Sequence, residues 1–206
     1  MKAKYHRQQA WKLMHDNWGV MALTTLVLFL ILAACGVLSY YPRFPYFSAF
    51  ALVAAVTAGP FLLGYNTLAL NIMRYRDAKI EGLFEGFRNF LRAFLLCLIN
   101  GLLVLLWTLL LIVPGIIKSL SYSMSYFILA DNPHMSSNDA RKLSAQIMHG
   151  NKARLFRLHL SFLGWWILCI LTLGILFLWI IPYHRAAVAS FYHGLTVRPQ
   201  TSYSYS

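Results

Sequence analysis

Residues 91–113 read LRAFLLCLINGLLVLLWTLLLIV, and this stretch decides the fold class. A membrane-spanning helix needs about 20 mainly apolar residues to cross a hydrocarbon core of about 30 Å. The stretch contains one charged residue, Arg92, and that residue lies at its start. It therefore predicts a helix surrounded by lipid rather than a helix of a soluble domain.

Five further segments share this apolar character, which predicts an all-α integral membrane protein with about six spans. Prolines punctuate them: Gly59-Pro60 lies within the second span, Pro114-Gly115 predicts a tight break after the third, and Pro182 ends the fifth. Together with Leu91–Val113, the predicted spans are Val20–Leu38, Phe47–Met73, Ile116–Ala130, Leu158–Ile181 and a marginal sixth, Ala186–Val197.

The composition supports the same class. Of the 206 residues, 59% are hydrophobic and only 12% are charged, whereas ordinary soluble domains carry about 25% charged residues. The formal net charge is +12, but the Lys and Arg residues flank apolar runs and form no soluble basic domain. Anionic lipid headgroups are therefore the predicted partners, and nucleic acid is not.

Cysteine usage predicts neither a disulfide nor a metal site. Cys35, Cys97 and Cys169 lie in apolar runs without CxxC or Cys/His spacing, so they are interpreted as small buried hydrophobic residues. One alternative stays open: Leu32-Ala33-Ala34-Cys35 fits the short signal at which bacterial lipoproteins are lipidated. Against it, small residues before a cysteine are common in membrane helices.

Two amphipathic stretches lie between the spans. Ala78–Phe90 places Ile80, Leu83, Phe84, Phe87 and Phe90 at helical spacing, and Ser136–His149 opens with Ser136 and Asp139 in the spacing of a capping box. Helices of this kind commonly lie in the plane of the membrane interface, and a cytoplasmic extension of the next span is the alternative.

A weak internal repeat orders these parts. Leu13–Trp18 resembles Ile147–Lys152, and Leu83–Arg88 fits the same frame loosely. Each copy precedes a long apolar run, a proline and a helix rich in small residues and tyrosines. We interpret the chain as one membrane domain, 1–206, containing repeat-like units at roughly 1–77, 78–133 and 134–200, with a flexible tail at 199–206.

The distribution of Lys and Arg predicts the orientation. Of the 18 such residues, all except Arg43, Lys118 and Arg185 fall at the N-terminus, in the second and fourth connections, or in the tail. The side richer in these residues faces the cytoplasm. With six spans, both termini are therefore expected in the cytoplasm.

Lys118 and Arg185 are the candidate functional residues, because charges within membrane segments are costly. Ser121, Tyr122 and Ser125 share one helical face with Lys118, and His184 adjoins Arg185. An outward-facing site for an anion or a lipid headgroup is one interpretation of this set. The other is that both cations extend toward the headgroups while the Ser/Tyr stripe packs between helices.

No enzyme pattern is present in the sequence: HExxH, GxSxG and P-loop motifs are missing, and the acidic residues are scattered. We expect no catalytic residue, no metal and no cofactor. The predicted function is a non-enzymatic lipid- or partner-binding factor of the envelope, with self-association left open. The rival is a small transporter with a binding site at helices broken near Pro60 and Pro114.

The chain also resembles a bacterial multi-pass membrane family known as domain of unknown function 975. The resemblance rests on GLFEGF at 82–87, LLLIVPGIIK at 109–118, SYSM at 121–124, ADNP at 130–133, and the stretch from Gly164-Trp165 to Pro182-Tyr183. Asn17-Trp18-Gly19 adds to it. The resemblance implies a multi-pass fold in the bacterial plasma membrane and assigns no activity.

Overall fold

The computed structural model describes residues 3–14, 17–40, 47–74, 80–172 and 174–196. These residues form helices and their connections, and no strand occurs among them. The elements are α1 (Ala3–Met14), α2 (Trp18–Tyr40), α3 (Phe47–Met73), the 3-10 helix η1 (Ile80–Asn89), α4 (Phe90–Leu110), α5 (Ile112–Tyr122), α6 (Ser125–Asp131), α7 (Ser137–Ile147), α8 (Lys152–Leu160), α9 (Leu163–Leu171) and α10 (Phe177–Thr196).

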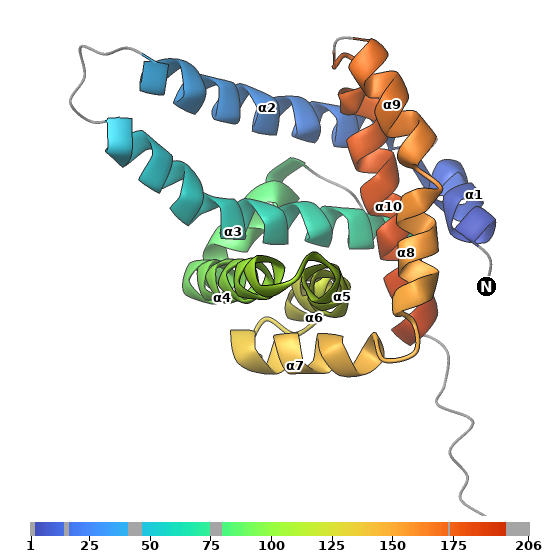
Figure 1. The fold of residues 1–206 in the computed structure, drawn as a ribbon. Helices are drawn as coiled ribbons and strands as arrows, with labels where there is room; N and C mark the ends of the chain where they lie inside the picture. The colour runs from blue at the N-terminus through green and yellow to red at the C-terminus, as the bar shows by residue number, and fades with distance from the viewer. Residues whose placement is uncertain (1–2, 15–16, 41–46, 75–79, 173, 197–206) are drawn as a thin grey trace, which may run out of the picture.

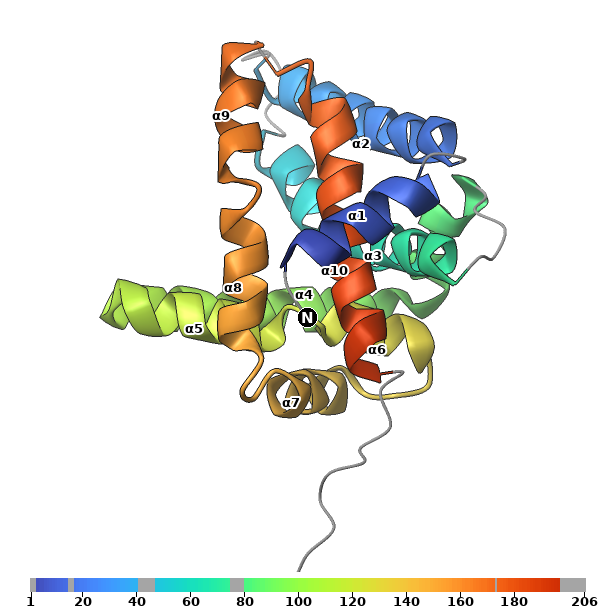
Figure 2. The same cartoon turned by 90° about the vertical axis from the view of Figure 1, so that its right-hand side faces the viewer.

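The long helices form three hairpins that point in different directions. In Figure 1, α2 and α3 run across the view, α8, α9 and α10 run from bottom to top, and α4 and α5 are seen nearly end-on. Figure 2 shows α4 and α5 from the side, pointing away from the rest of the molecule. We call the turned ends of the second and third hairpins, at Leu111 and at residues 172 and 174–176, the apices.

A short amphipathic helix precedes each hairpin, and these three helices lie away from the apices. α1 packs against α10 and α8, η1 packs against α3, and α7 packs against α4, α5 and α6. We call the side formed by α1, η1, α7 and the adjoining ends of α3, α6 and α10 the base. The three hairpins converge at the base and diverge toward their apices (Figures 1 and 2).

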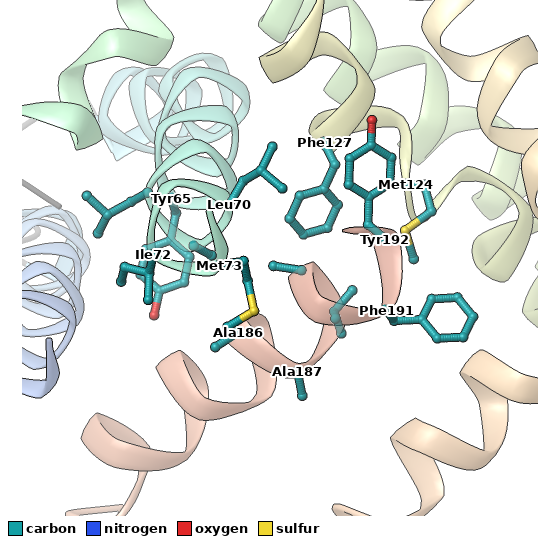
Figure 3. Close-up of a cluster of buried hydrophobic side chains, with 14 of the residues drawn as sticks. Tyr65, Leu70, Ile72, Met73, Met124, Phe127, Ala186, Ala187, Phe191 and Tyr192 are labelled. Carbon is teal, nitrogen blue, oxygen red and sulfur yellow. The ribbon is translucent and has the colours of Figure 1, made fainter. Parts of the chain in front are cut away.

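The core lies where the hairpins converge. Every residue of α10 from Ala186 to Tyr192 is buried, and the Tyr192 ring stacks on Phe127 of α6 at 5.3 Å between centroids. Figure 3 shows side chains of α3, α6 and α10 meeting in this region. Small residues such as Ala186 and Ala187 allow the backbone of α10 to approach its neighbours closely.

The apices, in contrast, expose apolar side chains. Leu109 is 85% exposed, and Ile170 and Leu171 are 73% and 74% exposed. Four helical segments in the described part of the chain are long and apolar enough to cross a membrane: Val53–Met73, Ile80–Leu110, Ile112–Asp131 and Lys152–Leu171. Counting the bent pair of α1 and α2 as one span adds a fifth. These helices suggest membrane insertion. The predicted sixth span, Ala186–Val197, is not among them.

The helix predicted for the second span agrees at both ends with α3, Phe47–Met73, which runs through Pro60 without interruption, whereas the transporter alternative placed a broken helix near Pro60. The break expected at Pro114-Gly115 is a wrong prediction, because it lies at Leu111. Leu111 alone joins α4 to α5 in an extended conformation, and Pro114 occupies the first turn of α5. Proline is tolerated there, because the first N–H groups of a helix have no partner within it.

The prediction for the fifth span is also wrong. The chain does not run as one helix from Leu158 to Pro182: it breaks at Ser161-Phe162, ends α9 at Leu171 and turns back before Phe177. Gly174 adopts φ 88° in this turn, and its N–H donates to the Cys169 carbonyl at 2.9 Å. Glycine accepts this left-handed conformation at low cost, so the chain reverses there and α10 runs through Pro182.

The first amphipathic stretch packs on α3 mainly through its glycines, and its predicted place in the membrane interface stays a prediction. In η1 the buried residues are Gly82, Leu83 and Gly86, whereas Phe84 is 51% exposed. A Cβ atom on Gly86 would lie 2.0 Å from the Pro60 carbonyl oxygen, and one on Gly64 would lie 1.9 Å from the Leu83 oxygen. The glycines therefore let η1 and α3 pack backbone to backbone, which displaces the phenylalanines to the flank.

The second amphipathic stretch begins as predicted. The Ser136 hydroxyl accepts a hydrogen bond from the Asp139 N–H at 3.1 Å and donates to the Asp139 carboxylate at 2.6 Å. This N-cap starts α7, which turns through Gly150 at φ 75° into α8.

Candidate anion and lipid site

Lys118 lies on α5 and faces the preceding helix. Its ammonium group is 5.0 Å from the centroid of the Trp107 ring on α4, and the side chain is half-buried. The tight turn at Leu111 brings the two helices together, because Gly115 lies directly against Thr108. A cation over an indole ring is stabilised by about 0.5–2 kcal/mol, depending on how far the pair is removed from water.

Ser121, Tyr122 and Ser125 lie together at the break between α5 and α6. The Ser121 hydroxyl donates to the Ile117 carbonyl at 2.8 Å, and the Ser125 hydroxyl donates to the Tyr122 carbonyl at 2.7 Å. Such local bonds compete with the helical ladder and bend helices. The hydroxyl groups of the predicted stripe therefore serve the backbone around the break.

α7 supplies hydrogen-bond partners for backbone groups at this break. The Ser144 hydroxyl donates to the Ser121 carbonyl at 2.7 Å and accepts from the Met124 N–H at 3.2 Å. The Arg141 guanidinium lies 5.4 Å from the Tyr122 ring centroid. Ser144 is fully buried, so α7 is a structural partner of α5 and α6 as well as an amphipathic helix.

His184 lies on α10 and pairs with His159 of α8. The Nε2 atom of His184 is 2.8 Å from Nδ1 of His159, so one ring donates a hydrogen bond to the other. The rings of Phe162 and Trp166 pack edge-on against His184, at 5.0 and 5.9 Å between centroids. The pair ties α8 to α10 within an aromatic environment.

Arg185 follows His184 and is half-buried. Among the residues that the structure describes, its guanidinium forms no hydrogen bond and no ion pair. Tyr65 of α3 and Tyr126 of α6 lie within electrostatic range of it. Within the described part of the chain, no ion pair with a carboxylate is seen for this cation.

The six predicted site residues therefore fall into two groups. Lys118, Ser121, Tyr122 and Ser125 lie on the second hairpin and contact α4 and α7, whereas His184 and Arg185 lie on α10 near α8. No hydrogen bond or ring contact joins the two groups in the described part of the chain. A single site that contains all six stays a prediction.

One polar cluster was not predicted from the sequence. Arg74, directly after α3, donates two hydrogen bonds to Asp131 at the end of α6, at 2.6 and 2.8 Å, and Tyr192 of α10 donates a third at 2.8 Å. The bonds to Asp131 raise the pKa of the Arg74 guanidinium above its ordinary value. The sequence could have suggested this pair, because Asp131 directly follows the predicted fourth span and Arg74 directly follows the predicted second span.

No group of three or more His, Cys, Asp or Glu side chains that could hold a metal ion occurs within the described ranges. The side chain of Cys35, at which lipidation was weighed, lies outside the described residues, as does Arg43.

The geometry defines a class: an all-helical protein with several helices apolar enough for membrane insertion, joined at a polar base. Residues 108–199 match the family model described as "Protein of unknown function (DUF975)". This part of the chain carries that family's domain, so the resemblance noted from the sequence is confirmed there. No curated protein and no solved structure matches the chain.

Proposed function

We propose that this protein is a non-enzymatic, multi-pass protein of the bacterial plasma membrane that binds anionic lipid at its cytoplasmic face. The observation that carries the proposal is that apolar and basic side chains lie on different parts of the molecule. Exposed leucines and isoleucines cover the apices, whereas the Lys and Arg residues of α1, η1, α7 and α8 gather toward the base. Anionic headgroups attract such basic segments with about 1 kcal/mol per residue near the surface.

The proposed topology has six crossings with both termini in the cytoplasm. Its support is the order of parts: α1, η1 and α7 each precede a hairpin and lie away from its apex. No charged residue occurs from Ala93 to Ile117 or from Leu160 to Tyr183, so neither described apex carries a charge. The threefold order of an amphipathic helix followed by a hairpin also supports the three repeat-like units. We further propose that Lys118 and Arg185 bind anions.

Lipid selectivity tests the proposal. The full chain would be purified in a mild detergent from bacterial membranes, and the retained phospholipids would be compared with those of the whole membrane. We expect phosphatidylglycerol and other anionic lipids to be enriched several-fold over zwitterionic lipids. A retained fraction identical to that of the membrane would contradict the lipid-binding proposal.

A transporter is the second candidate, favoured by two buried amide oxygens. Oδ1 of Asn66 on α3 and Oδ1 of Asn100 on α4 have no hydrogen-bond partner within the described part of the chain. Against a transport site, the freed backbone groups at the break between α5 and α6 are bonded to Ser144. Flux of labelled solutes into proteoliposomes, compared with empty vesicles, would distinguish this candidate from lipid binding.

A further inference from the structure

A groove along α1 is lined by cations and aromatic side chains. It encloses about 530 Å³. We call it the α1 groove and define it by its three cations and three aromatic residues; two glutamines also line it. The defining residues are Lys4, Arg7, Lys12, Tyr5, Trp11 and Tyr183.

The described lining of the α1 groove carries positive charge without an acidic partner. Among the residues that the structure describes, no Asp or Glu lines the groove. A second cavity, of about 400 Å³ between α3, η1 and α6, provides the contrast, because Glu85 lines it together with Arg88. The second cavity is balanced in charge, whereas the α1 groove presents donors and positive charge only. An anionic group is the complementary occupant.

Contacts with α8, α10 and the break after α8 hold α1 in place. His6, Ala10 and Met14 are buried, and the His6 ring is 3.2 Å from the Ser190 hydroxyl of α10. The Arg7 guanidinium donates to the Ser161 carbonyl at 3.2 Å, at the break between α8 and α9. The Tyr183 hydroxyl donates back to the Arg7 carbonyl at 3.2 Å. The groove is therefore preformed, and its exposed face is free to bind.

Arg7 retains donors for a ligand. One of its terminal nitrogens donates to the Ser161 carbonyl, and its guanidinium lies 5.9 Å above the Phe162 ring. Its buried Nε atom has no hydrogen-bond partner among the described residues. A guanidinium has five N–H groups in a fixed fork that matches phosphate oxygens. Lys4 and Lys12 are exposed on the same helix and add two mobile ammonium groups.

The aromatic residues match the other half of a lipid. Trp11 is 52% exposed, and its ring stands edge-on to Trp18 of α2 and Tyr183 of α10, at 5.7 and 5.6 Å between centroids. Tryptophan and tyrosine favour the level of the headgroups at a membrane surface. α1 is also bent by 96° from the first part of α2, which suits a helix lying along that surface.

We infer that the α1 groove binds the phosphate of an anionic glycerophospholipid from the leaflet that faces the base, with Trp11 against the upper part of the acyl chains. This inference rests on the proposed function and assigns its headgroup site.

The test compares two double variants of the full chain. Lys4→Gln with Lys12→Gln removes two charges from the groove, and both side chains are exposed, so the fold is retained. Lys142→Gln with Arg157→Gln removes two exposed charges from α7 and α8 and is the matched control. Binding of phosphatidylglycerol, with phosphatidylcholine as reference, is titrated in detergent and counted by native mass spectrometry.

We expect the groove variant to bind the first phosphatidylglycerol about 30-fold more weakly, from about fivefold per lysine. The variant of α7 and α8 measures the general attraction of the basic surface outside the groove, and its loss of affinity should be several-fold smaller. Equal loss in both variants would show attraction without a site and would overturn the inference. Displacement of the lipid by glycerol 3-phosphate at equal concentration would also overturn the inference, because the groove would then bind a soluble phosphate as well as it binds the lipid. If the wild-type chain itself shows no preference for phosphatidylglycerol, the proposed function fails instead.

Discussion

Asp131 accepts hydrogen bonds from two elements at once, so its carboxylate joins the ends of α3, α6 and α10. The Arg74 and Asp131 side chains are 25% and 19% exposed, and a partly buried bidentate pair is stronger than an ion pair in water. The three hairpins are thus fastened at the base by charge-assisted bonds, while the apolar core supplies most of the contact area.

Asp131→Asn should lower the free energy of unfolding by about 1–3 kcal/mol, because Arg74 loses its charged acceptor. Tyr192→Phe removes one bond only and should cost less. Thermal unfolding in detergent, followed by near-UV circular dichroism, measures both. Combining Asp131→Asn with Arg74→Gln should cost less than the sum of the single variants, and strict additivity would show that the pair is not coupled.

His6 makes stability depend on pH. Burial lowers the pKa of His6 from 6.5 to about 4, so the folded protein holds the ring neutral where the unfolded chain protonates it. Its contribution is therefore complete above pH 6.5 and is lost as the pH falls toward 4, by up to about 3 kcal/mol.

Unfolding measured at pH 7.0 and pH 4.5 should show this loss in the wild-type chain and a smaller one in His6→Gln. His134→Gln, at an exposed position, is the control and should keep the wild-type difference. The same pH dependence in His6→Gln would assign the effect to another group.

At the scale of elements, side chains of the amphipathic helices form hydrogen bonds with backbone groups at the breaks of neighbouring helices. Ser144 of α7 bonds the freed groups between α5 and α6, and Arg7 of α1 bonds the Ser161 carbonyl between α8 and α9. Water cannot supply these partners inside an apolar environment, so each break requires a side chain from a neighbour.

Ser144→Ala should therefore destabilise the protein by about 1–3 kcal/mol, since it leaves the Met124 N–H and the Ser121 carbonyl without their partner. Ser123→Ala is the matched control: its hydroxyl bonds only the Leu120 carbonyl, within the same break. Amide hydrogen exchange should increase at Met124 in the first variant and stay unchanged in the second. Equal hydrogen exchange at Met124 in the two variants would show that α7 does not stabilise the break between α5 and α6.

The contact between η1 and α3 should be equally sensitive to added volume. Gly86→Ala places a methyl group 2.0 Å from the Pro60 carbonyl oxygen, so η1 must move away and the free energy of unfolding should fall by about 1–3 kcal/mol. Gly101→Ala on α4 meets no atom within 4 Å and should leave stability equal or slightly higher. Thermal midpoints in detergent compare the two, and a tolerated Gly86→Ala would mean that the close approach is not needed.

These elements also show how far the sequence predicts the structure. Apolar length located α3 to the residue, and the Ser136 and Asp139 spacing located the start of α7. Turn positions were less predictable, because proline is accepted both within a membrane helix and in its first turn, as Pro182 and Pro114 show. The buried face of η1 was missed because hydrophobic periodicity gives no weight to glycine, although Gly82 and Gly86 make its contact.

The candidate site was predictable only in its parts. Sequence spacing predicted Ser121, Tyr122 and Ser125 on one face of a single helix, whereas the helix is interrupted between Tyr122, which ends α5, and Ser125, which begins α6. It does not reveal that α8 brings His159 to His184, or that α6 brings Asp131 to Arg74, because these pairs lie far apart in the chain. Such contacts depend on the directions of the hairpins, which no local pattern encodes.

At the scale of the whole molecule, the proposed topology is open to a direct test. Cys35, Cys97 and Cys169 would be replaced by alanine, and single cysteines introduced at Ile175, beside the third apex, and at Asn138, on α7. A membrane-impermeant maleimide added to intact cells should label the Ile175→Cys chain, and should label Asn138→Cys only after permeabilisation. The reverse pattern would invert the orientation, and labelling at neither position before permeabilisation would refute a full crossing by the third hairpin.

The charge-free stretch around Leu111 has a consequence for biogenesis. From Ala93 to Ile117 the chain carries no formal charge, and one residue joins the two helices. This part of the second hairpin can enter the bilayer as a closed pair, with no ionised group or hydrophilic loop to translocate. Insertion of this part is then driven by the transfer of leucine and isoleucine side chains alone, and a single lysine placed at Leu111 would oppose it directly.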